Sequence, residues 1–197
     1  MKDLIVWITI WYFVWGTFNI KLRWSLEQFK SKKYVGRGLF FLFAFLIIYF
    51  LYNRFLITYS AQLLISVIIA NMIGVYLGFK NSFFKKFTKD RYFLLFQTFN
   101  ILFQQSMVIA SIYLIKNIFG DNYTHFHYGL WFFLVHLPVL FLPCARLRIL
   151  YLIYSLFGGV IFSYTIANYQ YGLIINFLFH YCVYIWTIYY IKDEEKI

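Results

Sequence analysis

The sequence predicts an all-α fold, a polytopic bundle of about seven transmembrane helices, on three observations. Of its 197 residues, 63% are hydrophobic and 13% are charged, whereas a soluble domain carries about 25% charged residues. Apolar runs of roughly 20 residues, the length that crosses a bilayer, follow one another along the chain. Most Lys and Arg residues fall in the short gaps between these runs. Because the apolar runs take up nearly all of the chain, we expect a single transmembrane domain over residues 1–197.

The apolar runs define the expected helices in order. They cover residues 4–20, 38–57, 59–79, 92–119, 127–142, 147–168 and 171–191. The first run could pass for a signal peptide, but no small-residue cleavage site follows it, so we expect a retained helix. The second and third runs are divided by a very short turn. The fourth is long enough to cross the bilayer at a tilt, and the fifth is short and ends at Pro143.

The charges alternate between successive gaps. The first, third and fifth gaps hold most of the basic residues, namely Lys21, Arg23, Lys30, Lys32, Lys33, Arg37, Lys80, Lys85, Lys86, Lys89, Arg91, Arg146 and Arg148. The second gap holds only Arg54, and in the fourth gap Asp121 offsets Lys116. Because cytoplasmic loops are rich in Lys and Arg, this alternation predicts seven spans with the N-terminus outside and the C-terminus in the cytoplasm.

The net charge of +11 raises the alternative of a nucleic-acid-binding protein. The gaps between apolar runs explain that charge better, so we expect no nucleic acid as a partner and expect contacts with anionic membrane lipids. The abundance of Phe, Ile, Tyr, Lys and Asn is typical of an AT-rich bacterial genome. The expected location is therefore a bacterial cytoplasmic membrane.

Small residues repeat along the third run. Ala70, Gly74 and Gly78 lie at four-residue spacing, which places them on one face of a helix. Small residues at this interval let two membrane helices approach closely. We expect the partner helix to belong to the same chain rather than to a second copy.

No Asp or Glu falls within the predicted spans, and the polar residues away from the ends of these spans are neutral. They are Gln97, Asn100, Gln104, Gln105 and Ser111 in the fourth run, His136 in the fifth, and Asn176, His180 and Tyr184 in the seventh. Gln104, His136 and His180 lie at comparable depths, so they could form one cluster. Membrane proton relays and cation sites usually depend on buried carboxylates, which this pattern lacks.

These polar residues have two other interpretations, helix-joining hydrogen bonds and a zinc site. Gln, Asn and His often join membrane helices through hydrogen bonds and have no other role. A zinc site at His136 and His180 would lack a third ligand, so we expect no metal and no other cofactor.

The order of these groups resembles the CPBP family, the CAAX-protease and bacteriocin-processing (Abi-like) intramembrane proteases. That family carries a Glu-Glu pair followed by Arg, then Phe-x-x-x-His, and finally His-x-x-x-Asn. The matching stretches begin at Phe103-Gln104-Gln105, at Phe132 before His136, and at His180. The glycines Gly158 and Gly159 resemble the glycine-bearing helix between the two family histidines, and imply helix packing there. The resemblance covers residues 94–190, about half of the chain.

The departures from the family pattern fall on the groups that perform the chemistry. Gln104 and Gln105 stand in place of the two glutamates, Ile109 in place of the arginine and Tyr184 in place of the asparagine. In the family, a glutamate is thought to activate the attacking water, and a glutamine amide is too weak a base to do so. The resemblance therefore implies a degenerate member, a pseudoprotease that retains the scaffold.

Three functions follow as hypotheses from this pattern. The first is a non-catalytic subunit of a membrane complex that binds a membrane-protein partner or a peptide. The second is an active intramembrane protease that uses His136 or His180 as its base. The third is a transporter or lipid-handling protein, although the sequence shows no convincing internal repeat of the kind that transporters carry.

Overall fold

The computed structural model describes residues 2–17, 33–80, 92–141 and 145–194. These residues are helical apart from short turns, with no strand among them, and the all-α prediction is confirmed for this part of the chain. The α-helices are α1 (Lys2–Thr17), α3 (Lys33–Leu51), α4 (Asn53–Leu56), α5 (Ser60–Lys80), α7 (Tyr92–Phe119), α8 (His125–Val135), α9 (Ala145–Asn168) and α10 (Gly172–Glu194). Short 3-10 turns follow α4, α7 and α8, at η2 (Ile57–Tyr59), η3 (Gly120–Asn122) and η4 (Leu137–Phe141).

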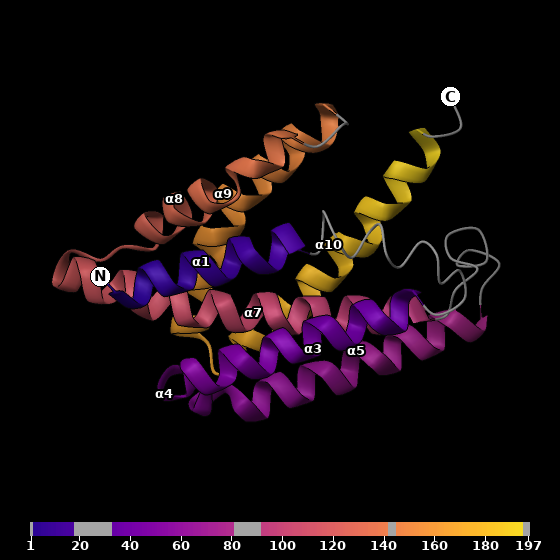
Figure 1. Ribbon diagram of the computed structural model, residues 1–197, viewed down its shortest axis with the longest axis horizontal. Helices are drawn as coiled ribbons and strands as arrows, with labels where there is room; N and C mark the ends of the chain where they lie inside the picture. The colour runs from indigo at the N-terminus through magenta and orange to yellow at the C-terminus, as the bar shows by residue number, and fades with distance from the viewer. Residues whose placement is uncertain (1, 18–32, 81–91, 142–144, 195–197) are drawn as a thin grey trace.

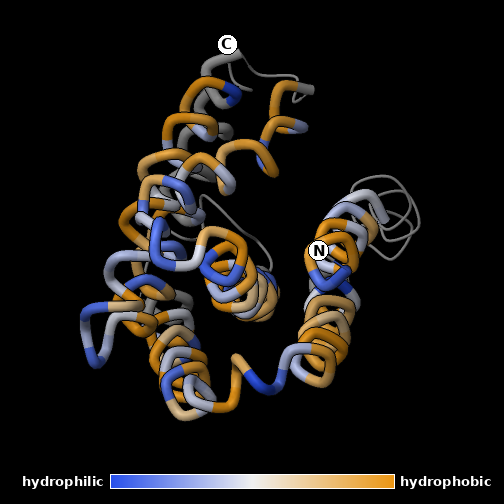
Figure 2. The backbone as a smooth tube through the Cα atoms, turned by 90° about the vertical axis from the view of Figure 1, so that its left-hand side faces the viewer, coloured by the Kyte–Doolittle hydropathy of each residue, from blue (hydrophilic) through white to orange (hydrophobic). Residues whose placement is uncertain are grey.

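Three stretches of the described helices are long and apolar enough to cross a membrane. They are Asn53–Tyr76, Leu94–Asn122 and Arg148–Asn168, and shorter apolar helices cover Val35–Leu51 and Gly172–Tyr184. Apolar residues run along all of these helices (Figure 2), and large ones such as Phe50, Met72 and Phe157 point outward. An outer surface of this kind suits a lipid environment better than water.

Helix α7 forms the centre of the bundle. It packs against α1, α3, α4, α5, α8 and α10, and it runs between α1, α8 and α9 on one side and α3 and α5 on the other (Figure 1). In its most apolar window 89% of the residues are buried, against 22% and 33% in the other two long apolar stretches. Polar side chains in this buried part of α7 must therefore find their hydrogen-bond partners within the protein.

The fifth predicted run is broken where the sequence predicted a continuous helix to Pro143. The α-helix ends at Val135, and η4 follows it. Pro138 is the physical reason, because it has no backbone N–H and its ring would clash with the carbonyl of Leu134 in a continuing α-helix. The chain turns instead through hydrogen bonds from His136 N to Phe133 O (3.0 Å) and from Val139 N to His136 O (2.9 Å). This break places His136 at the end of a helix.

Helices α8 and α9 meet at two glycines. A Cβ added to Gly159 would lie 2.7 Å from Phe132 Cβ and 3.0 Å from Gly129 Cα, and one added to Gly129 would lie 2.4 Å from Val160 Cγ2. Only hydrogen on both Cα atoms allows this approach. The packing role expected for Gly158 needs correction, because a Cβ there would meet nothing within 4 Å. Gly158 and Gly159 differ by about 100° around the helix, and only Gly159 faces α8.

The small-residue stripe of α5 lies partly in a packed interface. Ala70 is fully buried, and a Cβ on Gly74 would lie 3.1 Å from Tyr181 Oη and 3.2 Å from Leu94 Cβ. These neighbours belong to α10 and α7 of the same chain. The surroundings of Gly78 lie outside the described residues.

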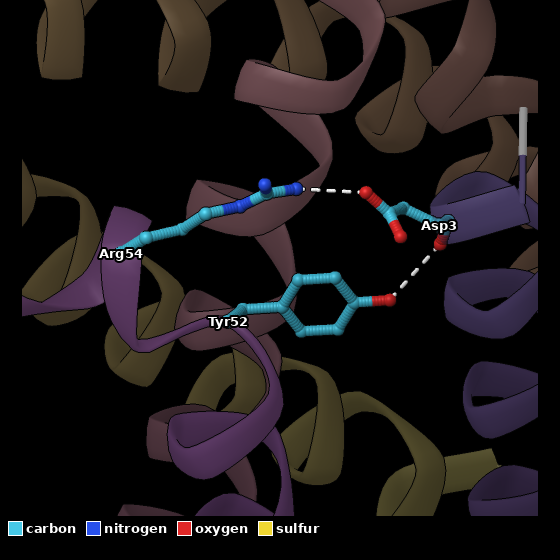
Figure 3. Close-up of polar contacts among 3 residues, drawn as sticks. All are labelled: Asp3, Tyr52 and Arg54. Carbon is cyan, nitrogen blue, oxygen red and sulfur yellow. Dashed lines mark hydrogen bonds and ion pairs between the residues drawn. The ribbon is translucent and has the colours of Figure 1, made fainter.

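An ion pair and a hydrogen bond join the N-terminal end of α1 to the junction of α3 and α4 (Figure 3). Arg54 Nη2 lies 2.7 Å from Asp3 Oδ2, and Tyr52 Oη donates to the backbone oxygen of Asp3 (3.0 Å). The Arg54 guanidinium also lies 4.5 Å from the centre of the Phe55 ring. The N-terminus and this junction therefore share one end of the bundle, and the C-terminus lies towards the other (Figure 1).

Candidate functional site

The best-connected polar cluster joins α7 to α10. Gln104 is almost fully buried, and its Nε2 donates to Tyr184 Oη at 2.8 Å. The same tyrosine hydroxyl lies 3.2 Å from Gln104 Oε1, to which it donates. One amide therefore uses both of its ends on a single hydroxyl of the facing helix.

A line of amides extends this cluster along α7. Gln104 Nε2 also donates to Asn100 Oδ1 (2.9 Å), and Asn100 Nδ2 donates to Gln97 Oε1 (3.1 Å). All three residues lie on one face because they are three or four positions apart. Ser111, which the sequence places on the same face, lies 2.9 Å from Tyr128 Oη instead and joins α7 to α8.

Gln105 contacts His180, one of the two candidate histidines. It is fully buried, and its Nε2 lies 3.1 Å from His180 Nδ1. Because an amide nitrogen only donates, this contact makes His180 Nδ1 the acceptor and leaves the proton on Nε2. Gln105 Oε1 has no hydrogen-bond partner in the described part of the chain. A buried amide oxygen without a partner is costly, so it is a natural acceptor for a bound group.

His136 occupies the break after α8. Its Nδ1 lies 2.7 Å from Phe132 O, a carbonyl that the end of the helix leaves without its usual backbone donor. Because a carbonyl only accepts, Nδ1 carries the proton and Nε2 keeps its lone pair. The ring packs on Phe132 (4.3 Å between ring centres) and on Trp11 of α1 (5.5 Å).

Asn176 positions α10 rather than joining the α7 cluster. Thr165 Oγ1 donates to Asn176 Oδ1 (2.9 Å), and Asn176 Nδ2 donates to Phe162 O (3.2 Å). Both partners lie on α9. His180 follows one turn later on α10 and packs against Phe162 (5.5 Å between ring centres), so the contacts with α9 set the depth at which its imidazole meets Gln105.

The contribution of α1 to this region was not predicted from the sequence. Trp11 packs between His136 and Phe103, with ring centres 5.5 Å and 6.2 Å away. Trp7 donates its indole N–H to Met107 O (2.9 Å). The four-residue spacing of these tryptophans was a usable signal, because it places them on one helix face. What lay against that face could not be known from the spacing.

A further histidine lies outside the predicted spans, at the start of α8. His125 Nδ1 lies 3.1 Å from Ser163 Oγ, and the ring packs edge-on against Tyr123 and Tyr164. Partial burial lowers the pKa of His125 below its usual value, and the positive charge of Lys116 lowers it further. The neutral imidazole is therefore the form that the fold favours.

The chemistry available to the α7–α10 cluster is that of neutral donors and acceptors. No carboxylate takes part in the hydrogen bonds described above, and the described residues contain no group of three or more His, Cys, Asp or Glu that could hold a metal ion. Neither glutamine can accept a proton from water. His136, which contacts Phe132 and Trp11 rather than the residues of this cluster, keeps its lone pair on Nε2 and could accept a hydrogen bond.

Comparison with known proteins adds no relative. No protein-family model, no curated protein and no solved structure matches this chain. An assignment to a family therefore rests on the residues themselves.

Proposed function

We propose that this chain is a catalytically inactive, CPBP-like integral membrane protein that binds a membrane-protein partner or a peptide at the Gln104–Gln105 cluster. The observation that carries the proposal is the placement of the glutamine pair. Gln104 and Gln105 occupy the positions where the resemblance implies catalytic glutamates, and they bond to Tyr184 and His180. The arrangement resembles that of an active site whose base has been replaced by amides.

The proposed topology has seven spans, with the N-terminus outside and the C-terminus in the cytoplasm of a bacterial cell. Its support is the alternation of basic gaps and the contact between Asp3 and Arg54. These residues belong to two segments predicted to lie on the outer side, and they meet at one end of the bundle (Figure 1).

Affinity purification of the tagged chain from its native membranes, in mild detergent and with mass spectrometry, tests this proposal. We expect a membrane protein to co-purify with the wild type and to be lost from Gln105→Leu, which removes the unpaired acceptor. Asn71→Leu is the matched control, because Asn71 Nδ2 donates to Val67 O of its own helix. A chain that always purifies alone, or equal retention of the partner by both variants, would refute the proposal.

One observation favours proteolysis as a second candidate function. The bond from His136 Nδ1–H to Phe132 O leaves Nε2 as an oriented base. If the chain cleaves a substrate, His136→Ala combined with His180→Ala should abolish cleavage. Full activity of that double variant in proteoliposomes would eliminate histidine-based hydrolysis.

A further inference from the structure

Helix α5 has an outward face with one polar side chain in its middle. Its inner face, which includes Gly74, packs against α7 and α10, and the helix lies at the edge of the bundle (Figure 1). On the outward side, Leu64, Ile68 and Val75 are 62%, 50% and 58% exposed. Asn71 lies among them and lines one shallow groove with Ile68 and Val75. We call Leu64, Ile68, Asn71 and Val75 the α5 seam, which is apolar apart from one amide.

Asn71 has hydrogen-bonding capacity that the fold leaves unused. Its Nδ2 donates to Val67 O of the preceding turn (2.9 Å), and this is the only hydrogen bond of the side chain within the described residues. An amide has a second N–H and an oxygen with two lone pairs. Asn71 follows Ser60, the first residue of α5, by about 16 Å along the helix axis, which is near the middle of a hydrocarbon core about 30 Å thick. Lipid offers no partner at that depth, so the free groups favour a contact with another protein helix.

The spacing of the α5 seam is that of two helices packed side by side. Its members follow one another at intervals of four, three and four residues, the heptad repeat of a left-handed helix pair. Most helix pairs in membranes cross with the same hand and a similar angle. In coiled coils of this kind, a single asparagine among apolar seam residues fixes both the register and the number of helices. The α5 seam therefore has the pattern of a pairing surface.

We propose that the α5 seam binds the α5 seam of a second copy of this chain, with the two Asn71 amides bonded to each other across a two-fold axis. Copies inserted with the same topology have parallel α5 helices, so Asn71 of one copy meets Asn71 of the other at the same depth. An amide complements itself, because the N–H of each copy donates to Oδ1 of the other. Residues 60–76 hold no charged side chain, so the pairing brings no like charges together. A helix of unrelated sequence has no reason to present an amide at this depth.

Resonance energy transfer between two labelled populations of the full-length chain in liposomes tests this inference. Cys144→Ser and Cys182→Ser remove the native thiols. Asp121→Cys, an exposed position in η3, carries the donor dye in one population and the acceptor dye in the other. We expect transfer above the level of random proximity, with a dependence on the protein-to-lipid ratio that fits a dimer. Transfer at the random level over all ratios would overturn the inference.

Two variants test whether the Asn71 amide forms the contact. Asn71→Leu should raise the protein-to-lipid ratio at half association by roughly 5- to 30-fold, the equivalent of the hydrogen bonds that it removes between helices. Asn168→Leu is the matched control, because Asn168 Nδ2 likewise donates to a carbonyl of its own helix, Tyr164 O (2.8 Å), but at the end of α9. It should associate as the wild type does. Unchanged association of Asn71→Leu, or an equal loss in Asn168→Leu, would contradict the inference.

Cross-linking tests the α5 seam with Asn71 left in place. On the same cysteine-free background, Leu64→Cys places a thiol on the seam. Ile65→Cys places one about 100° around the helix, at a position that is also exposed (43%). Oxidation with copper phenanthroline in native membranes should link Leu64→Cys into a species of twice the chain mass and leave Ile65→Cys unlinked. A product of another mass would identify a different protein on the seam and rule out a second copy, and preferential linkage at Ile65→Cys would place the pairing on another face.

Failure of this inference and failure of the proposed function give different results. The α5 seam lies on the side of α5 away from α7 and α10, so the pairing goes beyond the proposed function and does not depend on it. Asn71→Leu should lose self-association and keep the co-purified partner, whereas Gln105→Leu should lose the partner and keep self-association. Dimers that never retain a partner would refute the proposed function alone. A retained partner on a monomeric chain would refute only the pairing of α5.

Discussion

Replacing Gly159 with alanine should destabilise the bundle, whereas the same replacement at Gly158 should not. A Cβ on Gly159 would lie 2.7 Å from Phe132 Cβ and 3.0 Å from Gly129 Cα. Neither atom can move aside without its backbone, so α8 and α9 must separate. A Cβ on Gly158 would meet nothing within 4 Å. The two positions therefore form a matched pair in one helix.

The expected magnitude comes from the difference between the two variants. Each replaces a helical glycine with alanine and gains about 0.5–1 kcal/mol from backbone entropy, a contribution that cancels in the comparison. Overpacking costs about 1–3 kcal/mol and applies only at Gly159. Gly159→Ala should therefore be about 1–3 kcal/mol less stable than Gly158→Ala, or about 5- to 150-fold in the unfolding equilibrium.

Unfolding of the purified protein by SDS in mixed micelles, followed by far-ultraviolet circular dichroism, measures this difference. Because Phe132 O accepts a hydrogen bond from His136 Nδ1–H, Gly159→Ala should also shift the imidazole nitrogen resonances of His136, and Gly158→Ala should not. Equal stability of the two variants, or a less stable Gly158→Ala, would refute the assigned helix crossing.

Three further predictions use the same unfolding measurement. Tyr184→Phe removes both bonds to Gln104 and should cost about 1–2 kcal/mol; an unchanged midpoint would show that the α7–α10 contact is not formed. Arg54→Ala breaks an exposed ion pair and should cost less than about 1 kcal/mol, so a loss as large as that of Tyr184→Phe would contradict the exposed position of this ion pair. The lowered pKa of His125 means that the folded state favours the neutral ring, so stability should fall as the pH drops below about 6.5. That fall should be smaller in His125→Asn, and Lys116→Gln should move its midpoint to higher pH; superimposable pH profiles would refute the shift.

The bounds of the helices could be predicted well wherever the sequence has one dominant local signal. The fourth apolar run, predicted at residues 92–119, corresponds to α7 (Tyr92–Phe119), because no proline or glycine within the run interrupts the helix. The fifth run was predicted less well. Pro138 was present as a signal, yet Pro143 was taken as the end, and the end of α8 at Val135 follows from the nearer proline.

The candidate site was less predictable, because helical periodicity shows which residues share one face of a helix but not which other helix packs against that face. The order of Gln104, His136 and His180 suggested a cluster, and the structure brings Gln104 to Tyr184 and Gln105 to His180. The role of Asn176 differed from the expected stripe, because its nearest partners lie on α9. No local sequence signal shows whether a polar residue of α10 will bond to α7 or to α9.

The sequence by itself determined the all-α class of this protein and the presence of helices long and apolar enough to cross a membrane. A chain that is 63% hydrophobic, in runs long enough to cross a bilayer, must satisfy its backbone within helices. Only the tertiary structure decided which polar groups meet and which stay unpaired. Within the part of the chain that the structure describes, Gln105 Nε2 meets His180 Nδ1 of α10 while Gln105 Oε1 has no hydrogen-bond partner. Trp11 covers His136 because α1 packs across α7, a contact between segments more than 100 residues apart that depends on the packing of the whole bundle.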